Sequence, residues 1–418
     1  MNTRIQSILI VLMLLFLGFL PQMQAVSPAP DGCYPGFTTA EGCNALKFLT
    51  TGAGNTGVGW YSLYVNTTGN YNTGVGAGTL ILNTADSNTA VGTAALLLNT
   101  TGSNNTAVGT DALVYNDTGS SDTATGAFAL FSNTVGSSNA AFGASALYHN
   151  TEGTYNTAVG SSALASHIIG DRNTAIGYYA LQGDTTGERN TAVGGLALYQ
   201  NTSGTFNVAI GVQALSSNTE GGGNIALGFG AGDSVTTANN VICIGASGEN
   251  VNASCYIGNI FNATSSLGTA VFVNSAGKLG TTTSSRRFKD DIKPMDQASE
   301  AILALKPVTF RYKQQIDPKG VPQFGLVAEE VEKVNPDLVV RDKEGKPYSV
   351  RYDQVNAMLL NEFLKEHRAF IEEQHKVAQQ QEEIDLLKAE LKEQRALIQK
   401  VSDRMEINRS KPEVVAND

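Results

Sequence analysis

Charge is scarce over most of this chain of 418 residues. Of its 28 Lys and Arg and 38 Asp and Glu, only 5 and 13 come before Ser284, which leaves 23 and 25 for the segment 284–418. The net charge of −10 is mild, and the sequence contains no basic patch. This absence argues against nucleic acid as a partner. The change in charge at Ser284 predicts a domain boundary there.

Long hydrophobic runs are also missing, except for one near the start. The run from Ile8 to Leu20 follows Arg4, and Ala25 offers a small residue for cleavage. This pattern predicts a secretory signal peptide over residues 1–25. An uncleaved membrane anchor is the weaker alternative, because the run is shorter than the ~20 residues that a span needs. We expect a secreted or cell-surface protein with no membrane span after removal of the signal.

Cysteine and histidine are rare. The four cysteines lie as two near neighbours in sequence, Cys33 with Cys43 and Cys243 with Cys255. In an exported protein this spacing predicts two local disulfides, and buried free thiols are the alternative. No cysteine–histidine cluster indicates a metal, so we expect no metal and no cofactor. The scattered histidines receive no role: His149, His167, His367 and His375.

Glycine, in contrast, is abundant before the boundary and recurs at every seventeenth position, with one shorter step of sixteen. The residue before this glycine is apolar and mostly β-branched, and a leucine occupies the fourth position after the glycine in the first ten copies. We predict twelve coils, with these two apolar columns lining one narrow core. The glycines are Gly59, Gly76, Gly92, Gly109, Gly126, Gly143, Gly160, Gly177, Gly194, Gly211, Gly228 and Gly245.

Asparagine forms two further columns, at the fourth position before and the seventh position after the glycine in most copies. Asparagine tolerates left-handed backbone and bonds its own main chain, so stacked asparagines are expected to form ladders at two corners of each coil. We interpret the resulting Asn-x-Thr sequons as ladder positions first and glycan sites second.

Coils of about 17 residues with two short strands and two corners predict an all-β parallel solenoid or β-roll. Twelve coils at ~4.8 Å each would make a rod on the order of 55 Å long. One such coil buries little apolar surface, so we expect several chains to associate along the rod. The repeats "NTAVG" at 105–109 and 156–160 and "NTAIG" at 173–177 resemble the head repeats of trimeric YadA-like adhesins. That resemblance implies a trimeric surface fibre.

After the boundary the pattern is mixed α and β. Residues 298–313 predict a short helix that ends before Pro307 and then a strand, while residues 323–340 predict strand, helix, turn and strand. In the helix that follows, an apolar residue every seven positions predicts a coiled coil. The alternative is a solvated amphipathic helix lying on its own domain. The seam comprises Phe363, Phe370, Val377, Ile384, Leu391 and Ile398, joined by Leu387 and Val401.

Four segments of this region, "SSRRFKDDI", "GLVAEEV", "NPDLV" and "VRYDQVNAMLLNEFLKE", carry a second resemblance. Together they resemble the endosialidase-type intramolecular chaperone at the C-termini of phage tail spikes and fibres, over about residues 284–403. The family's motif S-D-x-R-x-K contains a self-cleaving serine–lysine dyad. The resemblance implies that Ser284 is the nucleophile, Lys289 the general base and Arg287 a supporting residue, with the cleaved bond flanked by Thr283 and Ser285. Ser285 occupies the position of the family's aspartate.

The chemistry of this motif places a condition on assembly. Lysine removes a hydroxyl proton only where burial or neighbouring cations favour its neutral form. Arg286 and Arg287 act in that direction, and the two aspartates that follow Lys289 oppose it. Five positions apart on a strand, Ser284 and Lys289 would face opposite sides, so the dyad needs a turn or a neighbouring chain. We therefore expect cleavage to wait until the oligomer has formed.

The predicted organisation has seven segments along the chain. They are a signal peptide (1–25), an N-terminal cap with a disulfide (26–50), the β-solenoid rod (51–262), a linker (263–283), a small α+β chaperone domain with self-cleaving activity (284–352), a coiled-coil helix (353–403) and a disordered tail (404–418).

These features predict a secreted, fibrous, adhesin-like or tail-fibre-like homotrimer that binds a host surface or glycan. Its C-terminal domain would assemble three chains and then cut itself away beside Ser284, acting as a serine peptidase on itself only. One alternative is a structural surface-layer protein that keeps an uncleaved trimeric foot. Another is a glycan-degrading tail-spike-like enzyme, which needs paired carboxylates, whereas the acids of the rod are mostly scattered over different positions of the repeat.

Overall fold

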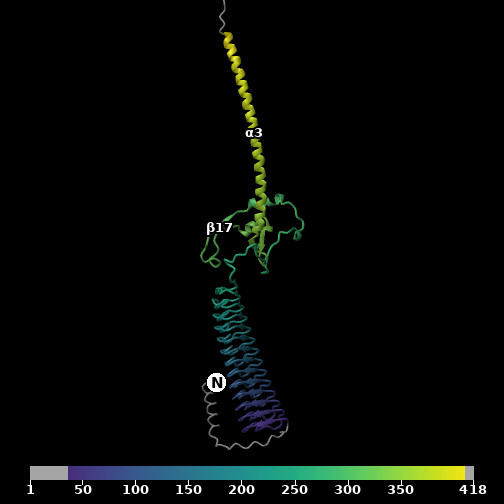
Figure 1. The fold of residues 1–418 in the computed structure, drawn as a ribbon, viewed down its shortest axis with the longest axis vertical. Helices are drawn as coiled ribbons and strands as arrows, with labels where there is room; N and C mark the ends of the chain where they lie inside the picture. The colour runs from purple at the N-terminus through teal and green to yellow at the C-terminus, as the bar shows by residue number, and fades with distance from the viewer. Residues whose placement is uncertain (1–35, 410–418) are drawn as a thin grey trace, which may run out of the picture. The chain divides into compact units, whose positions relative to one another are not determined.

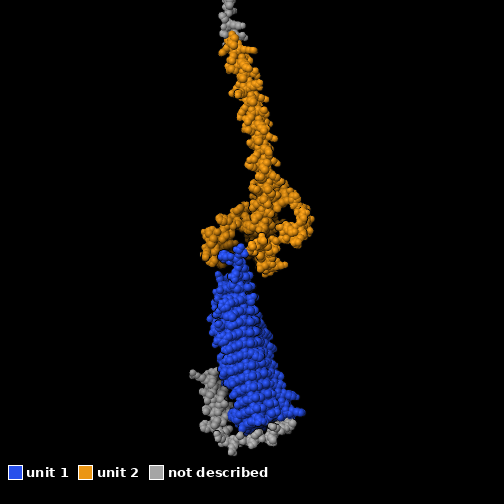
Figure 2. Space-filling model, viewed as in Figure 1, with its two compact units in different colours: residues 1–264 blue, residues 265–418 orange. Residues whose placement is uncertain are grey.

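The computed structural model describes residues 36–409, so the predicted signal peptide and Cys33 lie outside the described part of the chain. The chain divides into two compact units, residues up to 264 and residues from 265 onward (Figure 2). Unit 1 contains a sheet of 14 short strands. They are β1 (Thr39–Glu41), β2 (Thr56–Val58), β3 (Thr73–Val75), β4 (Thr89–Val91), β5 (Thr106–Val108), β6 (Thr123–Thr125), β7 (Ala140–Phe142), β8 (Thr157–Val159), β9 (Thr174–Ile176), β10 (Thr191–Val193), β11 (Val208–Ile210), β12 (Ile225–Leu227), β13 (Ile242–Ile244) and β14 (Cys255–Ile257).

The strands of unit 1 pair in parallel and in chain order, one per coil, as the stack of coils in Figure 1 shows. Equivalent residues of successive repeats stand opposite one another, for example Thr157 and Thr174. The predicted β-solenoid and its coil length are confirmed. The count of twelve coils is wrong, because β1 and β14 extend the sheet at both ends and end beside Gly42 and Gly258. The first of these added strands lies within the predicted cap.

The core of unit 1 is lined by alanine and leucine. The central residue of most strands is a fully buried alanine, and the leucine after each glycine is buried throughout the stack, from Leu63 to Leu215. The prediction that the residue before each glycine also lines the core is wrong. Those side chains point outward, and Val91 and Ile176 are 37% and 40% exposed. Side chains alternate along a strand, so once the central alanine faces inward its two neighbours must face outward.

The buried leucines adopt an unusual backbone conformation. Leu147 has φ of 52°, and the leucines of the other coils have nearly the same value. A left-handed conformation costs a branched residue about 1 kcal/mol. Complete burial of a leucine side chain contributes roughly 2–3 kcal/mol, which exceeds that cost. Burial therefore decides the identity of a position whose backbone alone would favour glycine or asparagine.

The glycine column is required by close approach between coils. At Gly143 φ is 137°, and an added Cβ would lie 2.6 Å from the carbonyl carbon and oxygen of Gly160 in the next coil. The same contact recurs at equivalent glycines along the stack. No side chain fits between two backbones at that distance, so the constant spacing of the column follows directly from the packing of the coils.

Both predicted asparagine ladders are confirmed. In the first column, Asn55 accepts a hydrogen bond from the backbone N–H of Asn72 at 2.9 Å through Oδ1 and donates to the carbonyl of Gly69 at 2.8 Å. In the second, Asn99 Nδ2 donates to Asn83 Oδ1 at 2.7 Å. These asparagines are fully buried, so each amide satisfies backbone groups that water cannot reach. As buried ladder residues, they are also poor glycan acceptors.

The predicted disulfide between Cys243 and Cys255 is absent from the structure, and both residues are free thiols. Cys255 pairs with Ile242, and Cys243 pairs with Tyr256, so the two cysteines are one residue out of register. Alternation along the strands therefore buries Cys243 and exposes Cys255. Burial raises the pKa of the Cys243 thiol. Cys43 is exposed, and its predicted pairing with Cys33 stays a prediction.

Because no bond depends on it, Cys255→Ser should change the free energy of unfolding by less than ~0.5 kcal/mol, the usual range for an exposed position. Urea unfolding under reducing and non-reducing conditions measures this. A loss of several kcal/mol confined to non-reducing conditions would contradict the free thiols.

Unit 2 carries a small α+β arrangement and one long helix. Its elements are β15 (Phe272–Val273), β16 (Leu279–Gly280), η1 (Arg286–Phe288), η2 (Asp296–Ala304), β17 (Val308–Phe310), β18 (Gln323–Gly325), α2 (Ala328–Val334), η3 (Pro336–Leu338), β19 (Val339–Arg341), β20 (Pro347–Val350) and α3 (Tyr352–Arg409). The order predicted from residues 298–340 is confirmed. The three pairs β15–β16, β17–β18 and β19–β20 are antiparallel.

A small core holds the middle of unit 2 together. One cluster of buried side chains includes Ile302 of η2, Val331 of α2, Leu338, Val350 of β20 and Met358 of α3. Helix α3 continues to Arg409 (Figure 1), so residues 404–409 of the predicted disordered tail are helical. Among residues 36–409, no helix combines the length and apolar character needed to cross a bilayer.

Candidate functional site

The predicted dyad lies on an exposed turn that precedes the small core of unit 2. The single 3₁₀ turn η1 separates Ser284 from Lys289, and the turn is closed by hydrogen bonds from Phe288 N–H to Ser285 O and from Lys289 N–H to Arg286 O, both 3.1 Å. The backbone on either side of the turn is extended. The turn supplies the change of direction that a regular strand lacks.

The turn does not bring the two dyad residues into contact. Among the described residues, no hydrogen bond joins Ser284 to Lys289, and both side chains are exposed. Arg287 instead places its guanidinium over the ring of Phe288, 4.6 Å from the centroid. Ser285 N–H lies 3.4 Å from Thr283 Oγ1 at the predicted cleavage point. The single chain therefore presents the chemical groups of the site without the burial that a lysine base needs.

A polar cluster around one buried hydroxyl ties the segment that follows the turn to the first part of α3. Ser299 of η2 is fully buried, and its hydroxyl donates to a carboxylate oxygen of Glu362 and accepts from Asn361 Nδ2 at 2.7 Å. Lys365 donates to Glu362 at 2.8 Å. This hydrogen bond holds the pKa of Glu362 below its usual value and raises the pKa of Lys365. Helix α3 thus anchors η2, the element that follows the turn carrying Lys289.

Sequence reasoning missed three titratable residues in the rod, all at positions where asparagine is expected. Asp122 interrupts the first asparagine column, and His167 and Asp184 occupy consecutive positions of the second. All three are fully buried. The sequence showed these residues as gaps in the two asparagine columns. The complete burial of these positions, however, could not be known without the structure.

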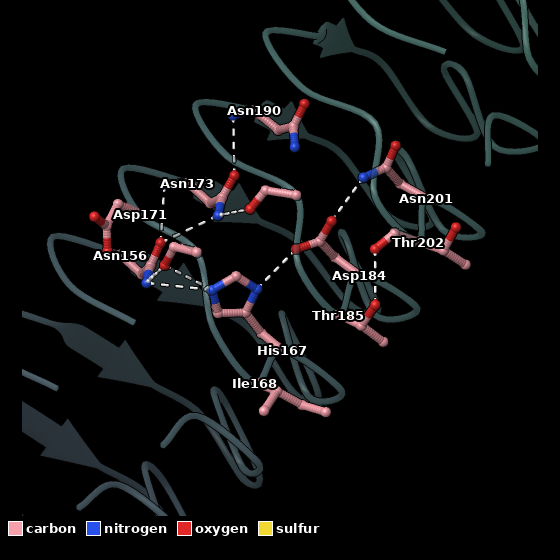
Figure 3. A network of polar contacts seen from close by, with 12 residues as sticks. Asn156, His167, Ile168, Asp171, Asn173, Asp184, Thr185, Asn190, Asn201 and Thr202 are labelled. Atoms are coloured by element: carbon pink, nitrogen blue, oxygen red, sulfur yellow. Dashed lines mark hydrogen bonds and ion pairs between the residues drawn. The ribbon is translucent and has the colours of Figure 1, made fainter. Parts of the chain in front are cut away.

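His167 and Asp184 form a buried pair between neighbouring coils, shown in Figure 3. His167 Nδ1 lies 2.7 Å from Asp184 Oδ2, and both side chains are 0% exposed. His167 Nε2 lies 3.0 Å from the carbonyl oxygen of Gly170. Asp184 Oδ1 also accepts from Asn201 Nδ2 at 2.6 Å, which joins the pair to the rest of the ladder.

Asp122 is the third titratable residue in the ladders. Its Oδ1 accepts from the backbone N–H of Asn139 at 2.8 Å and from Asn139 Nδ2 at 3.1 Å, and its Oδ2 accepts from Asn133 at 3.2 Å. Burial raises the pKa of Asp122 to about 7, against the opposing effect of these hydrogen bonds. The carboxylates of Asp122 and Asp184 are therefore occupied within the fold.

Comparison with known proteins gives one family match. Residues 284–340 match the family model described as the chaperone of endosialidase. No curated protein and no solved structure shows a significant match to the chain. The matched segment begins at Ser284 and covers the turn with Lys289, η2, α2 and the strands between them. The chain thus combines a β-solenoid with a segment similar to this chaperone family.

Proposed function

We propose that this protein is an extracellular or virion-associated trimeric fibre of the tail-fibre or adhesin type. In this proposal the solenoid is the working part, and the chaperone segment assembles three chains before separating by self-cleavage beside Ser284. The observation that carries the proposal is the match to the chaperone of endosialidase, which begins at Ser284 in a chain whose preceding unit is a repeat rod.

Association of chains along the rod is supported by an apolar column on its surface. The residue before each glycine is a large apolar side chain at most coils and faces outward, so one column follows the outer face of the 14-stranded sheet. Soluble monomers seldom expose so long a contiguous apolar surface. The members with exposures of 36–47% are Val75, Val91, Val108, Phe142, Val159, Ile176, Ile210, Leu227 and Ile244.

Helix α3 offers a second surface for association. Its 58 residues span about 87 Å at 1.5 Å per residue. The predicted seam is exposed along it, with Phe363, Phe370 and Ile398 at 64%, 59% and 68%. An isolated helix with that seam in water gains stability by pairing with copies of itself. The solvated amphipathic helix is less favoured, because past its first turns α3 covers no part of the small core.

The proposed cleavage is an N-to-O acyl shift followed by hydrolysis. Lys289 takes the hydroxyl proton of Ser284 while the oxygen attacks the carbonyl carbon of Thr283. The Thr283–Ser284 amide then breaks, its nitrogen receives the proton and becomes the amino group of Ser284, and an ester joins Thr283 to Ser284 Oγ. Water cleaves this ester, leaving a carboxylate on Thr283. Because the single chain leaves Lys289 exposed, a neighbouring chain supplies the missing burial.

The two alternatives are less well supported. Glycan hydrolysis needs two carboxylates that face a substrate. Asp122 and Asp184 are buried and engaged in the ladders, and of the acids that share a position in adjacent coils, Asp171 accepts from Thr154 and Glu188 pairs with Arg189. The permanent trimeric foot differs from the present proposal in one respect: Ser284 would be inert and the chain would not cleave itself. The rod would bind a host surface or a glycan after release.

Intact-mass analysis and sedimentation of the purified wild-type chain test the proposal. We expect a rod fragment that ends at Thr283, a second fragment that begins at Ser284, and a sedimenting rod whose mass is three times that of one rod fragment. A full-length chain that sediments as a trimer would support the permanent foot. A full-length monomer would contradict both the trimer and the cleavage.

A further inference from the structure

The second asparagine column has a prevailing direction of hydrogen bonding. Most of its asparagines donate two hydrogen bonds from Nδ2. One goes to Oδ1 of the equivalent residue in the preceding coil, and the other to the carbonyl of the residue three positions later in the same coil. Asn116, for example, donates to Asn99 at 2.7 Å and to Gly119 at 2.8 Å. Since these coils present the same groups, a coil that stacks on the wrong neighbour still makes these bonds. The ladder therefore stabilises stacking but does not select which coils are neighbours.

His167 and Asp184 reverse that direction at one place (Figure 3). His167 points toward Asp184 in the following coil and donates no hydrogen bond to the preceding coil. As a result Asn150 Oδ1, which would accept a bond in a regular ladder, is buried without a partner; among the described residues the other such atom is Asn66 Oδ1, in an early coil. A buried orphan acceptor is unfavourable. At Asn150 this cost comes with the replacement of two asparagines of the column by His167 and Asp184, which sets the pair apart from the regular ladder.

The contacts of His167 favour one protonation state. Both ring nitrogens face acceptors, namely the Asp184 carboxylate at 2.7 Å and the Gly170 carbonyl at 3.0 Å. The amide of Asn156 lies 3.4 Å from Nε2 and already donates to the same Gly170 carbonyl at 2.9 Å. An imidazolium donates at both nitrogens and so fits these two acceptors better than a neutral ring, whose unprotonated Nε2 would face the Gly170 carbonyl with only the second N–H of Asn156 at 3.4 Å to bond it. In that form the pair is a buried cation and anion in adjacent coils, and each charge depends on the other.

We propose that the His167–Asp184 pair fixes the register of the coils. If one coil loops out and the flanking coils stack on each other, an all-asparagine ladder closes again with its bonds intact. In this protein, exclusion of the coil that carries His167 or of the coil that carries Asp184 separates the two residues and leaves at least one buried charge without its partner, which is strongly unfavourable. The pair thus acts against misfolded stacks, a hazard of repeat proteins.

Cysteine reporters measure the register directly. In a background in which the four native cysteines are serine, Thr157→Cys with Thr191→Cys places thiols two coils apart, about 9.6 Å, too far for a disulfide. The two positions become adjacent only if the coil between them is excluded. The matched control, Thr157→Cys with Thr174→Cys, joins residues that are neighbours in the native register.

Full-length protein carrying each reporter pair is unfolded in denaturant, refolded and oxidised, with and without the change His167→Asn plus Asp184→Asn. We expect the 157–191 cross-link to be near background with the native pair and to rise at least ~10-fold in the double variant. The 157–174 cross-link should form in both. Equal 157–191 cross-linking in both backgrounds would overturn the proposal.

A second measurement needs no refolding step. Nitrogen-15 NMR of the wild-type protein labelled at histidine should show both ring nitrogens of His167 protonated at neutral pH, with assignment by His167→Asn. A neutral ring would overturn the proposal, because the pair would then carry no cation whose separation from Asp184 penalises a wrong register.

Discussion

Ser284→Ala should leave the chain at full length, because it removes the only atom that can form the ester with Thr283. Lys289→Ala should do the same by removing the base. For either change we expect the rate of self-cleavage to fall by roughly a thousandfold or more, the scale on which essential members of a nucleophile–base unit act. Denaturing gels and intact mass over a time course after refolding measure the rate.

Three further variants separate the chemistry from charge and folding. Ser285→Ala is the matched control for the nucleophile, and it should still cleave because its hydroxyl has no part in the proposed reaction. Lys289→Arg keeps the positive charge but cannot act as a base, so it should be as inactive as the alanine variant. Ser285→Asp restores the residue of the family's motif and should cleave at least as fast as the wild type.

Each variant must also be shown to assemble, since cleavage is proposed to follow trimer formation. Sedimentation should give a trimer for every full-length variant. Cleavage by Ser284→Ala at the wild-type rate would exclude Ser284 as the nucleophile. Cleavage by Lys289→Arg at the wild-type rate would leave Lys289 with a role in charge alone.

The sequence was most informative where one physical requirement recurs in every coil. The glycine and asparagine columns repeat because the same close approach and the same corner bonds occur along the stack, so their spacing alone predicts the solenoid. The order of elements in unit 2 was also predictable, because Pro307, Pro336 and the heptad residues mark the ends and faces of its elements.

The sequence was least informative about which way a column faces. The residues before the glycines are apolar, and hydrophobicity favours the core for them, but the small alanine between two larger side chains is what fits the narrow interior. Cys243 and Cys255 are near in sequence, yet their register differs by one residue, which decides between a disulfide and two free thiols. The dyad is equally undetermined, because Ser284 and Lys289 are both exposed in the single chain and no hydrogen bond between them is found among the described residues.

Asp122→Asn should stabilise the rod at neutral and alkaline pH. The structure shows why an amide suits this position better than a carboxylate. The neighbouring asparagines of the column donate from Nδ2 to a glycine carbonyl, as Asn105 does to Gly119 at 2.8 Å and Asn139 does to Gly153 at 2.9 Å. An ionised Asp122 cannot donate to the equivalent Gly136 carbonyl, and it carries a charge in a fully buried site.

The pH dependence follows from the direction of the shift. The pKa of Asp122 is about 7 in the folded chain and 3.8 without the fold, so the folded state binds the proton more tightly. Between pH 4 and 7 the unfolded chain loses this proton while the folded chain keeps it, and stability falls as pH rises. A difference of about three pKa units lowers the free energy of unfolding by roughly 4 kcal/mol above pH 7 relative to its value below pH 4.

Urea unfolding between pH 4 and 8, at one protein concentration, measures the difference in free energy of unfolding between the wild type and Asp122→Asn. The curves should nearly coincide at pH 4 and separate progressively up to pH 7, with the variant more stable. Asp233→Asn removes one negative charge from an exposed position and is the matched control. A constant difference between variant and wild type across this range would show that Asp122 keeps one protonation state throughout, and that its burial is compensated by the amides of Asn133 and Asn139.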